Sequence, residues 1–305
     1  MIAPKIVNSY HKQSFSGIGD FFRGSIYLYN RCRDLGISFS FSLCDHPISK
    51  HLKLRSEDTC DSDSIFDIPI NFSNSDKSLG LSKFSALELD KTFDFLKGMR
   101  GGKKFIFSNY HEIMNTPAVN VMNHINSIEL DEDLCNWFKK NIYFSDAIED
   151  AVDSSLNFKD FNIVHFRIGD TNSFCKDKTD FLIDEDYFLS IINRQEKKNT
   201  VIISDNNKLK SFFIKNQDKI SFPILIPHFK SSHTQKNTGI ESLEVGENSE
   251  FYTAFDLKLL TMASKVTGYS SYYWGTGFSC WVSKLFSVPF SCKPFMKEGK
   301  VFNLN

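Results

Sequence analysis

Side chains able to bind an anion gather in one run, His165-Phe166-Arg167-Ile168-Gly169-Asp170, at the end of an apolar segment that predicts a buried strand. Unpaired charges in such a place are costly, so these side chains need partners. His165 and Arg167 lie two residues apart and point to the same face of the strand. An arginine fork suits a diphosphate, a histidine can hydrogen-bond a base or phosphate, and Gly169 lets the backbone approach a ligand. The residues alone leave open a ligand site or a structural Arg–Asp pair that closes a loop.

A second segment, Ser16-Gly17-Ile18-Gly19-Asp20, lies between an expected strand at residues 3 to 10 and an expected helix at about residues 21 to 35. Two glycines before a helix N-terminus can form an anion-accepting nest. They can equally form a tight turn, because the full G-x-G-x-x-G pattern is absent. This segment is therefore a weaker candidate for phosphate binding.

A third segment runs from residue 255 to residue 281. Asp256 lies in an apolar stretch that predicts a helix, and the strand that follows ends at Gly268-Tyr269-Ser270-Ser271. Ser270 and Ser271 could cap the next helix or donate hydrogen bonds to a phosphate. In an open parallel sheet, ligands bind beyond the carboxyl ends of the strands, which is where all three segments fall.

The elements that position these segments alternate between strand and helix, which favours the α/β class, with a parallel α/β domain in the first half and a doubly wound sheet in the second. We expect two Rossmann-like domains, residues 1 to 155 and residues 156 to 305. Gly36 is expected to cap the first helix. The expected strands are 3 to 10, 37 to 43, 65 to 72, 103 to 108, 161 to 167, 200 to 204, 224 to 226 and 265 to 269. The expected helices are 21 to 35, most of 131 to 156, 184 to 194, 207 to 214, 251 to 263 and 277 to 286.

Composition sets limits on the function. The 305 residues are 41% hydrophobic and 24% charged, the balance of a soluble globular protein, and the formal charge of -1 gives no reason to expect nucleic acid as a partner. No apolar run approaches the ~20 residues that span a bilayer, and the N-terminus lacks the apolar core of a signal peptide. The seven cysteines are scattered without a C-x-x-C pair, which argues against disulfides and a zinc site. We expect a cytoplasmic bacterial or viral protein, possible peripheral membrane association, and no metal or other cofactor.

In this order, the three segments resemble motifs of the GT-B fucosyltransferases, the group of α-1,6-fucosyltransferases, nodulation fucosyltransferases and protein O-fucosyltransferases. The H-x-R-x-G-type motif corresponds to His165 to Asp170, and the glycine-rich first loop corresponds, in shortened form, to Gly17 to Asp20. The family's acid-led helix, strand and serine pair correspond to Asp256 and to Ser270-Ser271. The strand end Ser204-Asp205 matches a further family segment, whereas residues 45 to 150 align with nothing.

The resemblance implies a GT-B fold, with two Rossmann-like domains facing a cleft, and an inverting, metal-independent transfer of L-fucose from GDP-fucose to a glycan or other hydroxyl acceptor. Arg167 would contact the β-phosphate and stabilise charge on the departing GDP. His165 and Asp256 would contact the guanosine. The remaining residues of the implied donor site are Gly17, Gly19, Gly169, Asp170, Asp205, Ser270 and Ser271.

The resemblance leaves the group that assists the acceptor hydroxyl undecided. Asp20 is our first candidate, because Gly19 and Asp20 would lie across the cleft, facing the sugar and the acceptor. Asp170, Asp177 and Asp180 are the alternatives. In the α-1,6 group an acid follows the arginine by about eight residues, a position that Cys175 occupies here.

Two other classes of protein remain possible. A metal-dependent GT-A transferase would hold manganese with a D-x-D motif, and Asp61-Ser62-Asp63, Asp131-Glu132-Asp133 and Asp184-Glu185-Asp186 have that form. The last two open expected helices, where acids suit the helix dipole. A non-catalytic nucleotide- or sugar-binding protein on the same scaffold is the other alternative.

Overall fold

The structure is a computed structural model that describes residues 5–10, 17–43, 46–54, 65–67, 104–108, 126–168, 185–228, 249–270, 275–297 and 300–301. The chain divides into two compact units. The first comprises Met1–Asn115 and Asp131–Ser145, and the second comprises Thr116–Leu130 and Asp146–Asn305. We expected one boundary between residues 155 and 156, so the structure differs in two ways. Residues 116 to 130 belong to the second unit, and residues 146 to 155 do too.

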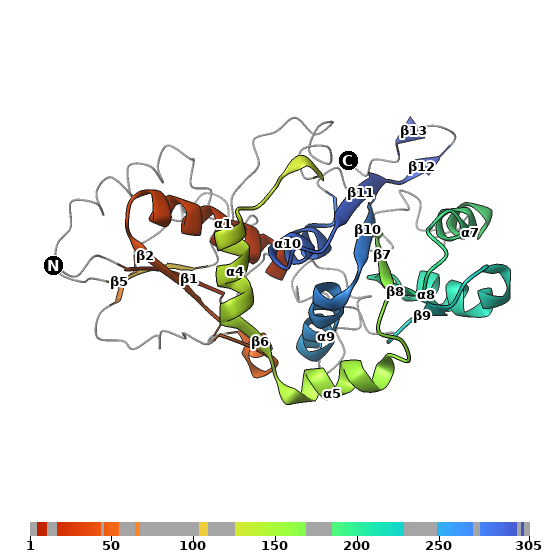
Figure 1. The fold of residues 1–305 in the computed structure, drawn as a ribbon, viewed down its shortest axis with the longest axis horizontal. Coiled ribbons are helices and arrows are strands. Elements are labelled where there is room, and N and C mark those ends of the chain that lie inside the picture. The colour runs from red at the N-terminus through yellow and green to blue at the C-terminus, as the bar shows by residue number, and fades with distance from the viewer. Residues whose placement is uncertain are drawn as a thin grey trace, which may run out of the picture. The chain divides into compact units, whose positions relative to one another are not determined.

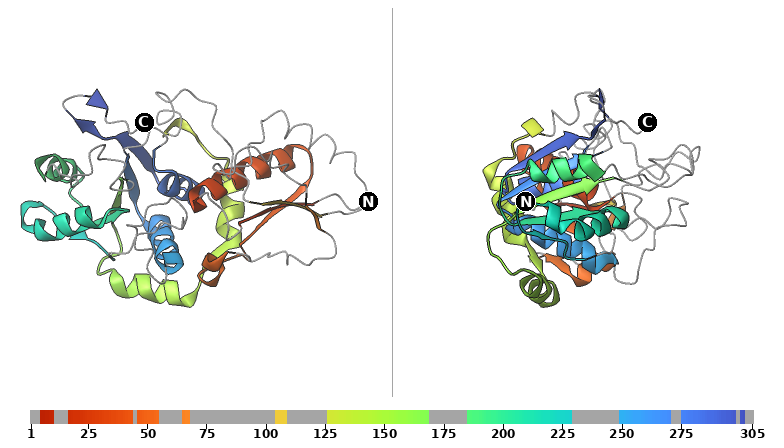
Figure 2. Two further views of the ribbon diagram at one scale, coloured as in Figure 1. Left: turned by 180° about the vertical axis from the view of Figure 1, so that it is seen from behind. Right: turned by 90° about the vertical axis from the view of Figure 1, so that its right-hand side faces the viewer.

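The first unit is built on a four-stranded parallel sheet in the order β2-β1-β5-β4. The helix α1 joins β1 to β2 and packs along both strands, which confirms the expected βαβ unit (Figure 2). Inside it, Asn8 of β1 donates a buried hydrogen bond to Ser25 of α1. The elements are β1 (Lys5–Ser9), α1 (Ile18–Asp34), β2 (Ser38–Ser42), β4 (Ile65–Asp67) and β5 (Lys104–Ser108).

Helix α1 begins at Ile18, earlier than the expected start near residue 21. Gly17 is the N-cap, and its carbonyl accepts hydrogen bonds from the backbone N–H groups of Asp20 and Phe21 at 3.0 and 3.2 Å. Gly19 is therefore a buried residue of the first turn rather than part of a loop. The C-terminal end of α1 confirms the prediction that Gly36 caps the helix, because Gly36 follows the C-cap residue Leu35 with a φ of 64°.

Helix α4 packs against the rest of the first unit through aromatic side chains. It is shorter than the helical stretch that we expected from residue 131 to residue 156. Phe138 of α4 stacks on Phe41 with ring centroids 5.3 Å apart and meets Phe22 edge-on. The short strand β6 then interrupts the helical stretch, because its Ile-Tyr-Phe sequence pairs antiparallel with β3. The elements are the 3-10 turn η1 (Pro47–Lys50), β3 (Leu52–Leu54), α4 (Glu132–Asn141), β6 (Ile142–Phe144) and, in the second unit, α5 (Asp146–Ser155).

The second unit contains a five-stranded parallel sheet in the order β11-β10-β7-β8-β9 (Figure 1). From β7 the chain first builds outward through β8 to β9, and then returns to the other side of β7 with β10 and β11. The direction of winding therefore reverses between β7 and β10. The elements are β7 (Asn162–Arg167), α7 (Glu185–Asn193), β8 (Thr200–Ser204), α8 (Asn207–Lys215), the 3-10 turn η4 (Gln217–Lys219), β9 (Ile224–Leu225), α9 (Ser249–Met262), β10 (Lys265–Ser270), α10 (Gly277–Leu285), β11 (Phe290–Pro294), β12 (Met296–Lys297) and β13 (Lys300–Val301).

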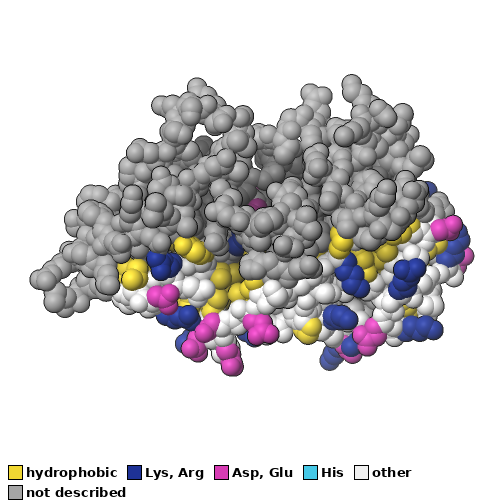
Figure 3. Space-filling view, turned by 90° about the horizontal axis from the view of Figure 1, so that it is seen from above, with side chains coloured by type: hydrophobic (Ala, Val, Ile, Leu, Met, Phe, Trp, Pro, Cys, Tyr) yellow, Lys and Arg dark blue, Asp and Glu magenta, His cyan; other side chains and the backbone are white. Residues whose placement is uncertain are grey.

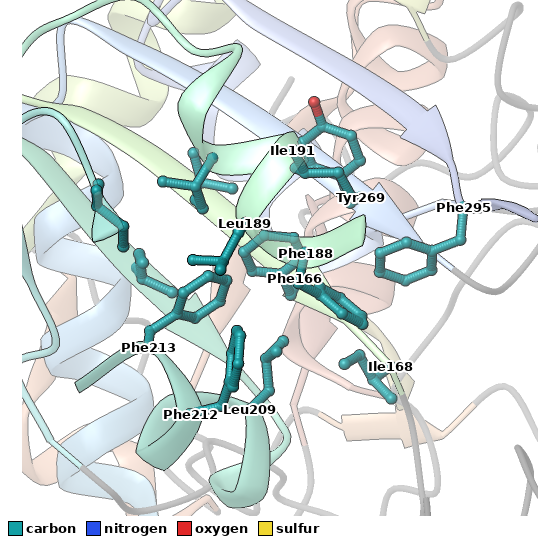
Figure 4. Close-up of a cluster of buried hydrophobic side chains, with 14 of the residues drawn as sticks. Phe166, Ile168, Phe188, Leu189, Ile191, Leu209, Phe212, Phe213, Tyr269 and Phe295 are labelled. Atoms are coloured by element: carbon teal, nitrogen blue, oxygen red, sulfur yellow. The ribbon is translucent and has the colours of Figure 1, made fainter. Parts of the chain in front are cut away.

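One hydrophobic cluster sets which way the side chains of β7 point (Figure 4). Val164, Phe166 and Ile168 all belong to it, together with apolar residues of α7 and α8. The ring of Phe166 stacks on those of Phe213 and Tyr269 at centroid distances of 5.4 and 5.6 Å. Since side chains alternate along a strand, the residues between these three, which are His165 and Arg167, face the opposite side of the sheet.

The edge strand β11 has a partner from a distant part of the chain. The side-chain amide of Asn126 donates to the carbonyl of Cys292 at 2.9 Å and accepts from its N–H at 2.7 Å. The ammonium group of Lys284 donates to the carbonyl of Ile128 at 2.5 Å. These contacts explain why residues 116 to 130 belong to the second unit. Helix α5 belongs there for a similar reason, because it packs on α9 and Glu149 pairs with Lys258 at 2.5 Å.

The described part of the surface carries charges of both signs. On the face drawn in Figure 3, lysine and arginine side chains are interspersed with aspartate and glutamate, in keeping with the formal charge of -1. Within the described ranges, no helix combines the length and the apolar character needed to cross a bilayer.

Candidate active site

Arg167 lies at the carboxyl end of β7, directly beside Ser270 at the end of β10, so it lies where the winding of the sheet reverses. Its guanidinium Nη1 donates to Oδ2 of Asp205, the residue that follows β8, and Oδ1 of Asp205 accepts the backbone N–H of Ile168 at 2.9 Å. The Asp205 side chain is 7% exposed, whereas that of Arg167 is 24% exposed. The carboxylate therefore fixes both the guanidinium and the backbone after it, and Arg167 still reaches the surface.

The sequence left open a structural Arg–Asp pair as the explanation of this motif, and the structure contains such a pair. The acid in this pair is Asp205, which directly follows the next strand, β8. A pair of this kind does not exclude a binding role, since a carboxylate that orients an arginine also presents it to a ligand. Gly169, Asp170 and Ser271 lie outside the described residues.

His165 is buried on the same face of β7 as Arg167. Its Nδ1 lies 2.8 Å from the hydroxyl of Ser279 in α10. Burial lowers the pKa of His165 to about 4, although the nearby Asp205 acts in the opposite direction. The ring is consequently neutral at pH 7.

Asp256 of α9 lies deep in the second unit, 1% exposed, and its Oδ1 pairs with Nε2 of His228 at 2.8 Å. Lys210 of α8 is also buried, and burial lowers its pKa while Asp256 and Asp205 act to raise it. The charges of Asp205 and Asp256 therefore both act on this buried lysine. Charges of both signs act on His165, those of Asp205, Arg167, Asp256 and Lys210.

Sequence reasoning missed two members of this cluster, Lys210 and His228. A signal for His228 was available, because it comes just after β9 as the His165 motif comes at the end of β7, and polar residues at strand ends were the criterion used. Nδ1 of His228 is buried without a hydrogen-bond partner among the described residues. Lys210 gave no such signal, since a lysine in a helix is usually exposed.

The other predicted residues have defined places. Ser270 is fully buried, and its hydroxyl donates to the carbonyl of Gly275 at 3.2 Å. In the first unit, Asp20 lies in the first turn of α1 and pairs with Arg23 at 3.3 Å. Of the D-x-D motifs, Asp131 is the N-cap of α4 and accepts from the N–H groups of Asp133 and Leu134, as the helix-dipole interpretation predicts.

Comparison with known proteins gave structural matches alone. No family model matches the sequence, and no curated protein matches it closely enough to count as a relative. Solved structures that resemble the chain include fucosyltransferase NodZ from Bradyrhizobium, with 10% identity, a TM-score of 0.45 and 92% of each chain covered. NodZ alpha-1,6-fucosyltransferase soaked with GDP-fucose matches with 11% identity and a TM-score of 0.45, and the same enzyme co-crystallized with GDP matches with 10% and 0.44, both again over 92% of each chain. At these values the matches do not decide the function, which must be argued from the site.

The depressed pKa of His165 gives a pH dependence of stability that can be measured. In the unfolded chain the His165 side chain is protonated below its ordinary pKa of 6.5, whereas in the folded chain it is protonated only below about pH 4. The free energy of unfolding therefore decreases as the pH falls from 6.5 toward 4. Between pH 7 and pH 5 we expect a loss of about 2 kcal/mol from this group. Urea unfolding of the wild type and of His165→Gln should show the smaller loss in the variant. Equal losses in the two proteins would contradict this account.

Gly268 of β10 is expected to tolerate no larger side chain. It pairs in register with His165 of β7 and with Cys292 of β11, and a Cβ added to it would lie 2.4 Å from the hydroxyl oxygen of the buried Thr276. Gly268→Ala should therefore lower the free energy of unfolding by about 1–3 kcal/mol. Gly277→Ala is the matched control, because no atom of the described residues lies within 4 Å of a Cβ added there. Thermal unfolding of both variants tests this, and equal midpoints would contradict it.

Proposed function

We propose that the chain is a glycosyltransferase that takes L-fucose from GDP-fucose, inverts its anomeric configuration and needs no metal ion. The observation that carries the proposal is the position of Arg167. It is a partly exposed guanidinium, oriented by Asp205, at the carboxyl end of the strand beside which the sheet reverses its winding. Ligands of open parallel sheets bind at that point, and a guanidinium there favours a ligand that carries phosphate.

The order of the sequence motifs supports a GDP-sugar in particular. The H-x-R-x-G-type run, the acid-containing helix α9 and the serine at the end of β10 occur in the order typical of the GT-B fucosyltransferases, on two parallel sheets. In the proposed reaction the acceptor oxygen attacks the anomeric carbon, and the bond from that carbon to the β-phosphate oxygen breaks. GDP departs with the bonding electron pair, and the acceptor proton passes to a base.

In the proposed reaction each of these residues has a separate role. Arg167 stabilises the negative charge that develops on the departing diphosphate, and Asp205 keeps the guanidinium in place. His165 and Asp256 lie on the guanosine side. Asp20, in the first turn of α1, is our candidate base. Its pairing with Arg23 means that it needs to exchange this partner for the acceptor hydroxyl.

Nucleotide-dependent thermal stabilisation tests this proposal. GDP, UDP, CDP and ADP are compared with and without manganese, using the wild type and Arg167→Ala. We expect stabilisation by GDP alone, independent of manganese and much reduced in the variant, because a ligand that binds the folded state raises its stability. Stabilisation that required UDP with manganese would support a GT-A enzyme instead. Stabilisation by GDP without release of GDP from GDP-fucose over a panel of glycan acceptors would support the non-catalytic alternative.

A further inference from the structure

A chain of hydrogen bonds runs from His165 across the second unit. The hydroxyl of Ser279 lies 2.8 Å from Nδ1 of His165 and donates to Oγ1 of Thr276 at 2.9 Å. Oγ1 of Thr276 in turn lies 3.8 Å from the sulfur of Cys292. All four residues are buried, and the chain crosses above Gly268, whose missing side chain leaves room for Thr276.

The direction of the chain follows from the number of protons. A serine hydroxyl has one proton, and that of Ser279 has two acceptors on Thr276: the hydroxyl oxygen at 2.9 Å and the backbone carbonyl, which can only accept, at 3.4 Å. Ser279 therefore accepts from His165, and Nδ1 of the ring must carry the hydrogen. At the far end, burial raises the pKa of the Cys292 thiol, so the thiol stays protonated, and either it or the Thr276 hydroxyl can donate in the contact between them.

We propose that Ser279 and Thr276 hold His165 in the tautomer protonated at Nδ1, so that Nε2 offers a lone pair to a hydrogen-bond donor of the bound nucleotide. Ser279 and Thr276 are then positioning residues. The identity of the ligand rests on the proposed function, whereas the tautomer does not.

Two properties of His165 give this arrangement a consequence for specificity. The ring is neutral at pH 7, because burial lowers its pKa to about 4, so it has one N–H and one lone pair. Nε2 makes no hydrogen bond with any described residue, so the lone pair is not already satisfied within this part of the chain. A ligand that presents an N–H or O–H to Nε2 gains a hydrogen bond. One that presents a lone pair leaves two buried acceptors facing each other, which binding sites reject strongly.

The tautomer can be measured without any ligand by nitrogen NMR of the protein labelled at histidine. The protonated and unprotonated ring nitrogens have well-separated shifts, and His165→Gln identifies the signal among the eight histidines. We expect the wild type to carry hydrogen at Nδ1. In Ser279→Ala the acceptor of the Nδ1 hydrogen is lost, so the ring should lose its preference for the Nδ1-protonated form. Thr276→Ser keeps the hydroxyl and should keep the wild-type tautomer.

Ser283→Ala is the matched control for loss of a buried hydroxyl from α10. Ser283 lies one turn after Ser279, is fully buried, and its hydroxyl has no hydrogen-bond partner among the described residues. The tautomer should be unchanged in this variant. A wild type protonated at Nε2, or a Ser279→Ala protein with an unchanged tautomer, would overturn the proposal. The wild-type measurement decides the tautomer even if a variant fails to fold.

The affinity for GDP, measured by isothermal titration calorimetry, tests whether Nε2 of His165 accepts a hydrogen bond from the nucleotide. Ser279→Ala should bind GDP about tenfold more weakly than the wild type, whereas Thr276→Ser and Ser283→Ala should bind it equally well. Unchanged GDP affinity in Ser279→Ala with an altered tautomer would overturn the role of Nε2 as acceptor. If the tautomers follow expectation but GDP does not bind the wild type, the proposed function fails and the hydrogen-bond chain stands.

Discussion

Replacing Arg167 by alanine is expected to reduce the release of GDP from GDP-fucose by about 100- to 1000-fold, the usual cost of losing one group that stabilises developing negative charge. The charge on the departing diphosphate would be left to the weaker dipoles around the end of β7. Steady-state kinetics should place most of the loss in kcat, because the interaction strengthens as the bond to the sugar breaks.

The control variants separate charge from geometry. Arg167→Lys keeps the positive charge but loses the planar fork, so it should recover a part of the activity. Arg194→Ala removes an exposed arginine near the end of α7 and should be fully active. Circular dichroism is needed alongside, since Asp205 loses its Arg167 ion-pair partner in Arg167→Ala. A folded Arg167→Ala protein with wild-type kcat would refute the catalytic assignment.

Replacing Lys210 by methionine is expected to have the largest effect on stability, a loss of about 3–5 kcal/mol at pH 7. Methionine fills a similar volume, but it removes the buried cation on which the charges of Asp205 and Asp256 both act. Removing one member of a buried charged group costs more than the group contributes as a whole, because the remaining charges lose part of their compensation. Urea unfolding, read as the midpoint and slope, measures the change.

Two further variants test whether charge is the cause. Lys208→Met changes an exposed lysine of the same helix and should shift the free energy of unfolding by less than about 0.5 kcal/mol. The double change Lys210→Met with Asp256→Asn should be more stable than Lys210→Met alone, because it removes one of the two carboxylates whose charge the lysine offset. If the double variant is the less stable of the two, the loss comes from packing rather than from charge.

Local sequence signals were sufficient for most of the second unit. Thr200–Ser204 matches the expected strand, and the alternation of Val164, Phe166 and Ile168 with His165 and Arg167 predicted their opposite faces. These signals work because a strand buried on both faces needs apolar residues throughout, so a polar residue within it marks an internal partner.

The errors have physical reasons that lie outside any short window of sequence. Ile142–Phe144 follows a helical pattern without a break and becomes a strand because β3 is available to pair with it. Phe290–Pro294 was missed as a strand, since a proline ends it and its sequence is not strongly apolar. Lys210 became part of the site through the packing of α8, which buries its side chain together with the apolar face of the helix.

The pairing of Asn126 with Cys292 has a consequence for how the protein is made. The two residues are 166 positions apart, so the segment that contains Asn126 leaves the ribosome long before β11 has been synthesised. In between, the chain returns to the first unit for α4 and β6. The second unit therefore cannot complete its fold during synthesis until nearly the whole chain has emerged. A fragment that starts at residue 146 would expose the backbone of β11 as an open edge, prone to self-association.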